Sequence, residues 1–287
     1  MMYTIYILLF LSVQFAFAQK YVFQFEGNKR KYFVHLPPGY SSSEKLPLIM
    51  NFHGIVANSK QQEKYSRMNE TADKHGFIVV YPYGKGHFWN TGIGKKSYLR
   101  SRNDVAFVNE MLNHLIRDFN IDTTRIYSCG LSLGGYFSYR LACELSHRIA
   151  AIASVGGVTS DSTAKFCINS RPVPVLQIHG TQDPIVKYEG IKQSLGAEET
   201  VNYWIKKNNC TVSSDTSMLP DECPKDKTTA QLIRFKGIKN QQVWFVKIQN
   251  GGHTWPGTRI DYLFLGKTNM DFKASELIWE FFKQFHL

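Results

Sequence analysis

One stretch near the middle of the chain decides the fold, and it reads Arg125-Ile126-Tyr127-Ser128-Cys129-Gly130-Leu131-Ser132-Leu133-Gly134-Gly135-Tyr136. A short apolar run typical of a β-strand enters Gly130, and a run with helical character leaves from Leu133 toward Leu145. Between the two runs lies the pattern Gly-x-Ser-x-Gly, in which small residues at Gly130 and Gly134 allow a sharp turn from strand to helix. This turn predicts that the hydroxyl of Ser132 is presented outward.

The same turn places the backbone N–H of Leu133 at a helix N-terminus. The partial positive charge there favours a developing oxyanion. One turn is therefore expected to supply a nucleophile, Ser132, and one oxyanion donor. A chance turn is the alternative, because glycine and serine are common residues. The strand before the motif and the helix after it favour the functional interpretation.

The rest of the chain alternates between strand-like and helix-like segments. Apolar runs predict strands at 46–52, 77–81, 149–155, 173–178 and 243–248, with a weaker strand at 232–235. Helical patterns cover 61–75, 198–208 and 271–285, and a further amphipathic helix is expected to be capped by Asp104. Residues 21–25 and 31–36 suggest an opening hairpin. The alternation predicts an α/β fold: a mostly parallel sheet, helices on both faces and an N-terminal antiparallel hairpin.

Two further polar residues follow predicted strands. Asp183 ends the run His179-Gly180-Thr181-Gln182-Asp183, and His253 lies in the run Gly251-Gly252-His253-Thr254-Trp255-Pro256. The carboxyl ends of parallel strands meet at one edge of a sheet. Alone, Asp183 would be interpreted as a turn cap and His253 as a surface histidine. In the order Ser132, Asp183, His253 they match a nucleophile, an acid and a base, so we predict a catalytic triad.

The second oxyanion donor is expected in the loop after the strand at 46–52. There the backbone N–H of Ile55, or of a neighbour, is the candidate. His53 in the same loop is expected to be structural, fixing the loop by hydrogen bonding.

Aromatic residues lie in other loops that are expected to reach this edge. The rings of Trp89 and Trp255 are candidates for covering an acyl or aryl group of a substrate. Packing of the loops against themselves is the alternative. Asn90 and Tyr136 are candidate substrate-binding residues of the same kind.

The composition is ordinary for a globular protein of 287 residues, with 43% hydrophobic and 20% charged residues. The formal net charge is +11, which is compatible with nucleic acid, an anionic membrane or an acidic polysaccharide as a partner. The basic residues are scattered, with short clusters such as Lys29-Arg30-Lys31. We therefore expect no nucleic-acid partner and interpret the charge as solvated surface.

Residues 1–18 are interpreted as a signal peptide. An apolar stretch runs from Tyr3 through Phe17, and Ala16-Phe17-Ala18 forms a small-x-small cleavage site before Gln19. The start lacks the usual Lys or Arg, and an uncleaved membrane anchor is the alternative. The stretch is short for a membrane span and is interrupted by polar residues. Residues 19–287 are then expected to form one exported domain without membrane attachment.

Five cysteines are consistent with export, because an oxidising compartment permits disulfides. Cys210 could pair with Cys223 around a polar loop, and Cys143 could pair with Cys167. Cys129 would then remain as a small apolar core residue. No Cys-x-x-Cys pattern or histidine cluster suggests a metal site.

Several segments together resemble a known family: Leu36-Pro37-Pro38-Gly39-Tyr40, Phe52-His53-Gly54, Trp89-Asn90, Asn103-Asp104-Val105, Gly130-Leu131-Ser132-Leu133-Gly134-Gly135, Leu141-Ala142-Cys143-Glu144, His179-Gly180-Thr181-Gln182-Asp183 and Gly252-His253-Thr254-Trp255-Pro256-Gly257. The chain resembles the esterase family that includes polyhydroxybutyrate depolymerases and feruloyl esterases. The resemblance implies a secreted α/β-hydrolase without a cofactor, in which Ser132, Asp183 and His253 are catalytic. It also brings acetylxylan esterase activity into range. The chain departs from the family pattern at Leu133, Asn103 and Lys187.

These observations together predict a secreted serine carboxylesterase that acts on small-molecule or oligosaccharide esters. Feruloyl or acetyl groups on plant xylan are the first candidate substrates, and short hydroxyalkanoate esters are the second. Solid polyester is not expected, because the linker and polymer-binding domain usual in extracellular depolymerases are not seen. A peptidase on the same scaffold is a third candidate. A secreted polysaccharide-binding protein without turnover is the alternative of another class.

Overall fold

The computed structural model describes residues 18–100, 102–210, 215–239 and 241–287. The predicted signal peptide, apart from Ala18, therefore lies outside the described residues. Within the described ranges, every helix is too short or too polar to cross a lipid bilayer.

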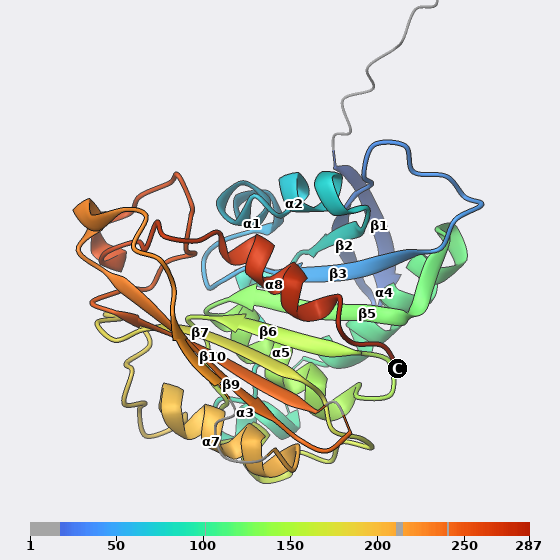
Figure 1. Cartoon of the computed structure of the whole chain (residues 1–287). Coiled ribbons are helices and arrows are strands. Elements are labelled where there is room, and N and C mark those ends of the chain that lie inside the picture. Colours follow the sequence, from blue (N-terminus) through green and yellow to red (C-terminus); the bar gives the residue numbers. More distant parts are fainter. Residues whose placement is uncertain (1–17, 101, 211–214, 240) are drawn as a thin grey trace, which may run out of the picture.

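Within these residues, one sheet of ten strands runs through the molecule (Figure 1). From one edge to the other its strands are β1 (Gln19–Phe25), β2 (Asn28–His35), β4 (Ile78–Pro82), β3 (Leu46–Phe52), β5 (Ile121–Leu131), β6 (Ala151–Val155), β7 (Val175–Gly180), β10 (Gln242–Gln249), β9 (Thr229–Lys236) and β8 (Asp215–Met218).

The strands from β4 to β10 in this order are parallel to one another, and antiparallel strands lie at both edges. At one edge, β1 pairs with β2 and β2 pairs with β4; at the other, β10 pairs with β9 and β9 with β8. Strands β4, β6 and β7 are buried along their whole length, which is why they appear as continuous apolar runs in the sequence. The predicted mostly parallel sheet and the N-terminal hairpin are both confirmed.

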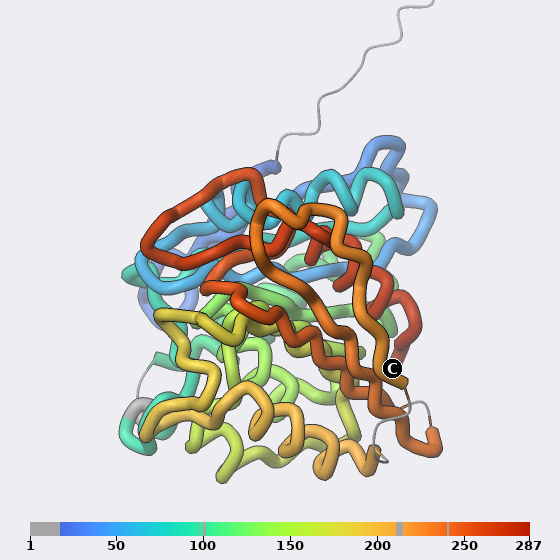
Figure 2. Tube along the Cα trace, turned by 60° about the vertical axis from the view of Figure 1, so that its left-hand side comes forward, coloured from blue at the N-terminus to red at the C-terminus, as the bar shows by residue number. Residues whose placement is uncertain are grey.

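Helices cover both faces of the sheet, as predicted. One apolar core includes buried residues of α4 (Asp104–Asp118), α5 (Leu133–Glu144) and α7 (Ala197–Lys207). The other includes residues of α1 (Ser59–Ser66), α2 (Met68–His75) and α8 (Ala274–Phe282). The turned view shows α7 and α8 on opposite sides of the sheet (Figure 2). Shorter helices are α3 (Lys95–Arg100), α6 (Asp161–Phe166), η1 (Lys85–His87), η2 (Pro224–Asp226) and η3 (Leu263–Leu265).

The helix expected over 61–75 is two helices in the structure. The break is at Arg67, which has a left-handed backbone with φ of 53° and ψ of 29°. Its N–H still bonds to the carbonyl of Glu63, which ends α1 before α2 starts. Arginine, unlike glycine or proline, does not indicate the end of a helix, so the apolar periodicity predicts one continuous helix across this position.

The cap predicted at Asp104 is also wrong by one residue. Asn103 caps α4, because its side-chain oxygen accepts the N–H of Ala106 at 3.0 Å. Asp104 is the first helical residue, and its buried carboxylate binds the guanidinium of Arg30 at 2.9 Å.

Of the two predicted disulfides, Cys143–Cys167 is present and Cys210–Cys223 is not. Cys210 forms a β-bridge with Gly237, just past the end of β9, whereas Cys223 lies in the loop before the start of β9. The eight residues of β9 span about 25 Å at roughly 3.3 Å per residue. A disulfide requires Cα atoms within about 7 Å, so these two cysteines cannot be joined. Burial raises the pKa of the Cys210 thiol to about 11.

Candidate active site

Ser132 lies on the turn between β5 and α5 with a strained backbone. Its φ of 54° and ψ of −120° are unusual for any residue other than glycine. The turn is held from both sides, because the N–H of Ser132 bonds to the carbonyl of Val155 at 2.8 Å and its carbonyl accepts the N–H of Tyr136 at 3.0 Å. These hydrogen bonds therefore help to hold Ser132 in its strained backbone conformation.

Glycine is required beside Ser132 because α5 packs close to β3. A Cβ atom at Gly134 would lie 2.1 Å from the carbonyl oxygen of Phe52, and one at Gly130 would lie 2.6 Å from the same oxygen. Backbone atoms cannot yield as a flexible side chain can. The interpretation of Gly-x-Ser-x-Gly as a sharp strand-to-helix turn that needs small residues is confirmed.

His253 and Asp183 form a buried hydrogen bond. Nδ1 of His253 lies 2.7 Å from Oδ2 of Asp183, and both side chains are 5% exposed or less. The other carboxylate oxygen, Oδ1, accepts the N–H groups of Ile185 and Val186, each at 2.8 Å. A carboxylate can only accept, so Nδ1 of the imidazole donates its proton to Asp183, and Nε2 is the ring nitrogen left to exchange a proton with a substrate or a hydroxyl.

Three strand ends bring these residues to one edge of the sheet. Ser132 follows β5, Asp183 follows β7 by three residues and His253 follows β10 by four. The loop after β6 packs beneath the imidazole, since a Cβ atom at Gly156 would lie 3.0 Å from Nδ1 of His253. The sequence-based expectation that all three would share the carboxyl edge of the sheet agrees with this arrangement.

Ser132 and His253 line the same cavity, which has a volume of about 500 Å³. Its wall is largely apolar. The lining residues are Gly54, Ile55, Val56, Ala57, Gln61, Gln62, Tyr65, Leu131, Ser132, Ile185, His253, Tyr262, Phe264 and Leu265. A substrate held beside Ser132 could therefore place an apolar substituent against this wall within the same cavity as the imidazole.

The two expected oxyanion donors come from the two segments next to the Ser132 hydroxyl: α5 and the loop after β3. Leu133 is the first residue of α5, so its N–H has no partner within the helix. Ile55 lines the cavity from the loop after β3, and the position of a Cβ atom on neighbouring Gly54 is 3.3 Å from Cβ of Ser132. The loop thus contacts the turn that carries the serine.

His53 holds this loop in place, as expected from the sequence. One ring nitrogen, Nδ1, lies 2.7 Å from the carbonyl oxygen of Gly54, and the other, Nε2, accepts the N–H of Gly84 at 3.0 Å. These partners fix a neutral ring, because a protonated Nε2 could not accept. Burial lowers the pKa of His53 to about 4, which agrees with a structural role.

The two tryptophans proposed for substrate contact are buried and do not line the cavity. Trp89 stacks on Phe137 and donates its indole N–H to the carbonyl of His53 at 3.0 Å. Trp255 donates to the hydroxyl of Ser275 at 3.2 Å. Both rings therefore pack the loops, which was the alternative interpretation.

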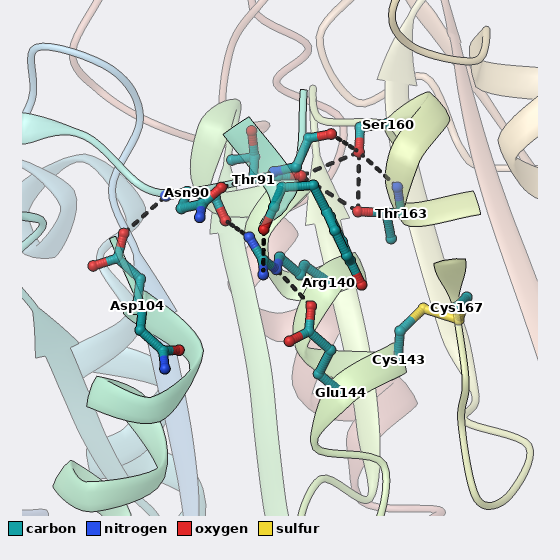
Figure 3. A network of polar contacts seen from close by, with 12 residues as sticks. Asn90, Thr91, Asp104, Arg140, Cys143, Glu144, Ser160, Thr163 and Cys167 are labelled. Atoms are coloured by element: carbon teal, nitrogen blue, oxygen red, sulfur yellow. Dashed lines mark hydrogen bonds and ion pairs between the residues drawn. A yellow bond between two sulfur atoms is a disulfide. The ribbon is translucent and has the colours of Figure 1, made fainter. Parts of the chain in front are cut away.

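Asn90 and Tyr136 likewise lie outside the lining of the cavity. The N–H of Asn90 donates to Asp104 at 2.8 Å, and its carbonyl accepts from the guanidinium of Arg140 at 3.0 Å (Figure 3). Tyr136 donates its hydroxyl to Ser194 at 3.2 Å. The contacts of Asn90 connect the loop after Trp89 to α5, close to the Cys143–Cys167 disulfide.

Sequence reasoning missed most of the cavity wall. Tyr65, Ile185, Tyr262, Phe264 and Leu265 line it but were not candidates. One signal was available, because Tyr262-Leu263-Phe264-Leu265 is an apolar run within an otherwise polar loop. Tyr65 and Ile185 carry no such signal, and only the packing of α1 and of the loop after β7 brings them to the cavity.

His179 lies behind Asp183 in a buried network. Its Nε2 lies 2.9 Å from the carbonyl oxygen of Val186 and 3.6 Å from Oδ2 of Asp183, while Nδ1 is 3.0 Å from Nε2 of Gln177. Burial lowers the pKa of His179, so the ring is neutral. Among the described residues, no group of three or more His, Cys, Asp or Glu side chains is arranged to hold a metal ion.

A serine on a strand-to-helix turn of a mostly parallel sheet, with an acid and a histidine after later strands, defines the α/β-hydrolase fold. The model of the family described as esterase PHB depolymerase matches residues 30–196, and the chain belongs to this family. Ser132 and Asp183 lie within the matched range, and His253 lies beyond it.

Similar proteins agree with this assignment. Over 197 residues the chain is 30% identical to feruloyl esterase B of Piromyces equi, and this match covers 63% of this chain and 36% of that protein. Over 168 residues it is 29% identical to a bifunctional acetylxylan esterase/xylanase of Neocallimastix patriciarum, covering 58% of this chain and 23% of the relative. The chain therefore spans about a quarter to a third of the lengths of these two relatives.

The fold is shared with a solved structure of a ferulic acid esterase from Anaeromyces mucronatus in complex with ferulic acid. The TM-score is 0.61 at 16% sequence identity, and the match covers 96% of this chain and 92% of that chain.

Proposed function

We propose that the protein is an exported serine carboxylesterase that hydrolyses esters of plant cell-wall polysaccharides, with Ser132, His253 and Asp183 as its catalytic triad. The observation that carries the proposal is the buried bond of 2.7 Å between His253 and Asp183, on an imidazole that shares a cavity with Ser132. Membership of an esterase family supports it.

In the proposed mechanism, Nε2 of His253 takes the proton from the Ser132 hydroxyl as its oxygen attacks the ester carbonyl. Asp183 holds the imidazole by Nδ1 and stabilises the imidazolium that forms. The imidazolium then donates its proton to the leaving alcohol, and an acyl-enzyme remains. A water molecule, activated by the same imidazole, releases the acid and restores the serine.

The N–H groups of Leu133 and Ile55 are the proposed oxyanion donors. Because Leu133 is the first residue of α5, the positive end of the helix dipole would stabilise the oxyanion in addition to the hydrogen bond from its N–H. Donors fixed in the backbone need no reorganisation as charge develops on the carbonyl oxygen, and each such donor contributes roughly 10²-fold or more to the rate.

The apolar wall supports an acyl group with an aromatic or alkyl body. The cavity of about 500 Å³ is lined by Tyr262 and Phe264 on one side and by Ile55 and Ile185 elsewhere. Feruloyl and acetyl esters of xylan are the proposed substrates, because the names of the relatives describe feruloyl esterases and an acetylxylan esterase. Export, through cleavage after Ala18, is part of the proposal, since these substrates are extracellular.

Replacement of the proposed nucleophile tests this function. Ser132→Ala should lower kcat on p-nitrophenyl acetate by roughly 10³-fold or more. Ser42→Ala, at an exposed serine far along the chain from the turn, is the matched control and should retain full activity. Near-normal turnover by Ser132→Ala would refute the triad. If a fluorophosphonate failed to label the parent protein covalently, this would instead favour a binding protein without turnover.

Short hydroxyalkanoate esters are the second candidate substrates, because the description of the matching family includes PHB depolymerase. Parallel assays on methyl ferulate, acetylated xylan and a hydroxybutyrate oligomer distinguish the candidates. A kcat/KM at least tenfold higher on the oligomer than on both plant esters would favour the second.

A further inference from the structure

A second cavity, with a volume of about 480 Å³, lies on the N-terminal hairpin and is strongly basic. We call it the lysine cleft. Its lining residues are Lys20, Val22, Lys29, Arg30, Lys31, Tyr83, Lys85 and Gly86, and none of them is acidic. Its volume is close to that of the cavity that contains Ser132.

The alternation of side chains along the hairpin separates two faces. One face packs on α4, where Phe23 stacks on Phe107 and the guanidinium of Arg30 lies 3.6 Å from the centre of the same ring. In the antiparallel register Val22 pairs with Lys31, and both alternate with those inward residues. Val22 is 52% exposed. The opposite face of the hairpin is therefore the basic one.

Two of the lysines that line the cleft have uncharged partners. Arg30 is neutralised by buried Asp104 at 2.9 Å. Lys31 instead lies over the ring of Tyr83, with Nζ 3.6 Å from its centre, and Lys85 bonds to the amide oxygen of Asn28. Neither of these two partners carries a negative charge. Side chains of one sign gathered in a concave site concentrate the electrostatic potential, and this favours an anionic ligand.

One loop separates the lysine cleft from the cavity of Ser132. Tyr83, Lys85 and Gly86 line the cleft on one side of it. On the other side, the carbonyl of His87 accepts the N–H of Val56 at 3.3 Å, and Nδ1 of His87 lies 2.9 Å from the carbonyl oxygen of Ala57. Val56 and Ala57 line the cavity of Ser132. The two sites are thus neighbours across a loop that is hydrogen-bonded to both.

We propose that the lysine cleft binds a carboxylate-bearing sugar, such as a uronate, on the same polysaccharide chain whose ester enters the cavity of Ser132. This inference rests on the proposed function. It assigns the basic residues a role in selecting acidic segments of the substrate. A saccharide fits better than a membrane surface because the site is concave and pairs lysines with an aromatic ring and an exposed valine.

Binding without turnover provides the direct test. Both proteins carry Ser132→Ala, and one also carries Lys20→Gln, Lys29→Gln and Lys85→Gln. Isothermal titration uses two probes of equal length: a xylo-oligosaccharide bearing one glucuronate and the neutral xylo-oligosaccharide. The acidic probe should bind the single variant about tenfold more tightly than the neutral probe, and the lysine substitutions should remove this difference. Raising the salt concentration should weaken the binding of the acidic probe selectively.

A charge-matched control separates a local effect from net charge. Lys206→Gln, Lys225→Gln and Lys239→Gln remove the same charge from exposed positions near the opposite edge of the sheet, and this control should keep the preference for the acidic probe. Equal affinity for the two probes, or an unchanged preference after substitution in the cleft, would overturn the inference. If the acidic probe bound through the lysines but the parent protein, with Ser132 intact, hydrolysed none of the esters, the cleft would stand and the proposed function would be refuted.

Discussion

The two sides of the cavity of Ser132 are built in different ways. On one side, the serine edge (Ser132, Asp183, His253 and the glycines packed against them) lies at strand ends, where His253 and Asp183 form a buried hydrogen bond. On the other, the apolar wall includes residues of the loop at η3, where Tyr262 is 41% exposed and Phe264 is 71% exposed.

This difference suggests that one side of the cavity holds the residues proposed for catalysis and the other side contacts the variable part of the substrate. The positions of the serine edge are fixed by buried hydrogen bonds and by backbone packing that leaves no space for a Cβ atom at Gly130 or Gly134. The part of the wall in the loop at η3 is exposed, and exposed loops tolerate substitution. We therefore expect changes in the edge to affect catalysis or folding, and changes in the wall to affect the choice of substrate.

The largest effect is expected from the acid of the edge. Asp183→Asn would retain the shape of the side chain but remove the charge that stabilises the imidazolium, and its amide could present a donor to Nδ1 of His253. We expect kcat on p-nitrophenyl acetate to fall by about 10³-fold to 10⁴-fold with little change in KM. A change of less than tenfold in kcat would show that Asp183 does not support the imidazole.

Two glycines separate folding from catalysis within the edge. Gly134→Ala would place a Cβ 2.1 Å from the carbonyl oxygen of Phe52, and we expect it to lower the free energy of unfolding by about 3 kcal/mol or more. A Cβ atom at Gly54 would lie 3.3 Å from the Cβ of Ser132 and 3.5 Å from the carbonyl oxygen of Leu131, so Gly54→Ala is much less crowded. It should fold and lose activity. Denaturant unfolding and kcat, measured on both variants, check this contrast, and equal stability of the two would contradict it.

A pH dependence of stability is expected from His53, which supports the loop beside the edge. Its pKa is lowered from 6.5 to about 4, so between these values the folded state binds fewer protons than the unfolded state. Stability is then fully present above pH 6.5 and falls as the pH drops toward 4, by about 2 kcal/mol between pH 7.5 and 5. His53→Gln should reduce this loss, as measured by urea unfolding at both pH values. The same loss in the variant would exclude His53 as its source.

The smallest effect is expected from the wall. Tyr262→Ala combined with Phe264→Ala should raise KM for methyl ferulate by about tenfold, because an aryl group would lose its apolar contacts. The KM for p-nitrophenyl acetate should change less, because its small acyl group makes fewer contacts with the wall. If both substrates were affected equally, the wall would not distinguish acyl groups, and the contrast between the two sides would fail.

The location of Ser132, Asp183 and His253 at one edge of the sheet could be predicted from the sequence because the signals are local. A continuous apolar run identifies a buried parallel strand, and the residue that follows it must lie at the carboxyl edge, as Asp183 and His253 do. The need for a small residue at Gly134 could also be predicted, since a glycine within a strand-to-helix turn indicates close packing.

The wall and the aromatic residues could not be assigned in the same way. An isolated tryptophan in a loop has no periodicity to show whether its ring points into a cavity or into the core, and both Trp89 and Trp255 are buried. Cys210 and Cys223 looked like a pair because they are close in sequence, but the β8–β9 hairpin, which the sequence did not indicate, holds them at opposite ends of a strand.

An open sheet of ten strands leaves two edges, β1 and β8, with backbone groups that could pair with a strand of another molecule. At the first edge, Lys20 places a charge on an exposed strand, and at the second, β8 has only four residues. Charge and shortness both discourage intermolecular β-pairing, so the basic hairpin would also help to keep the protein from aggregating at high concentration.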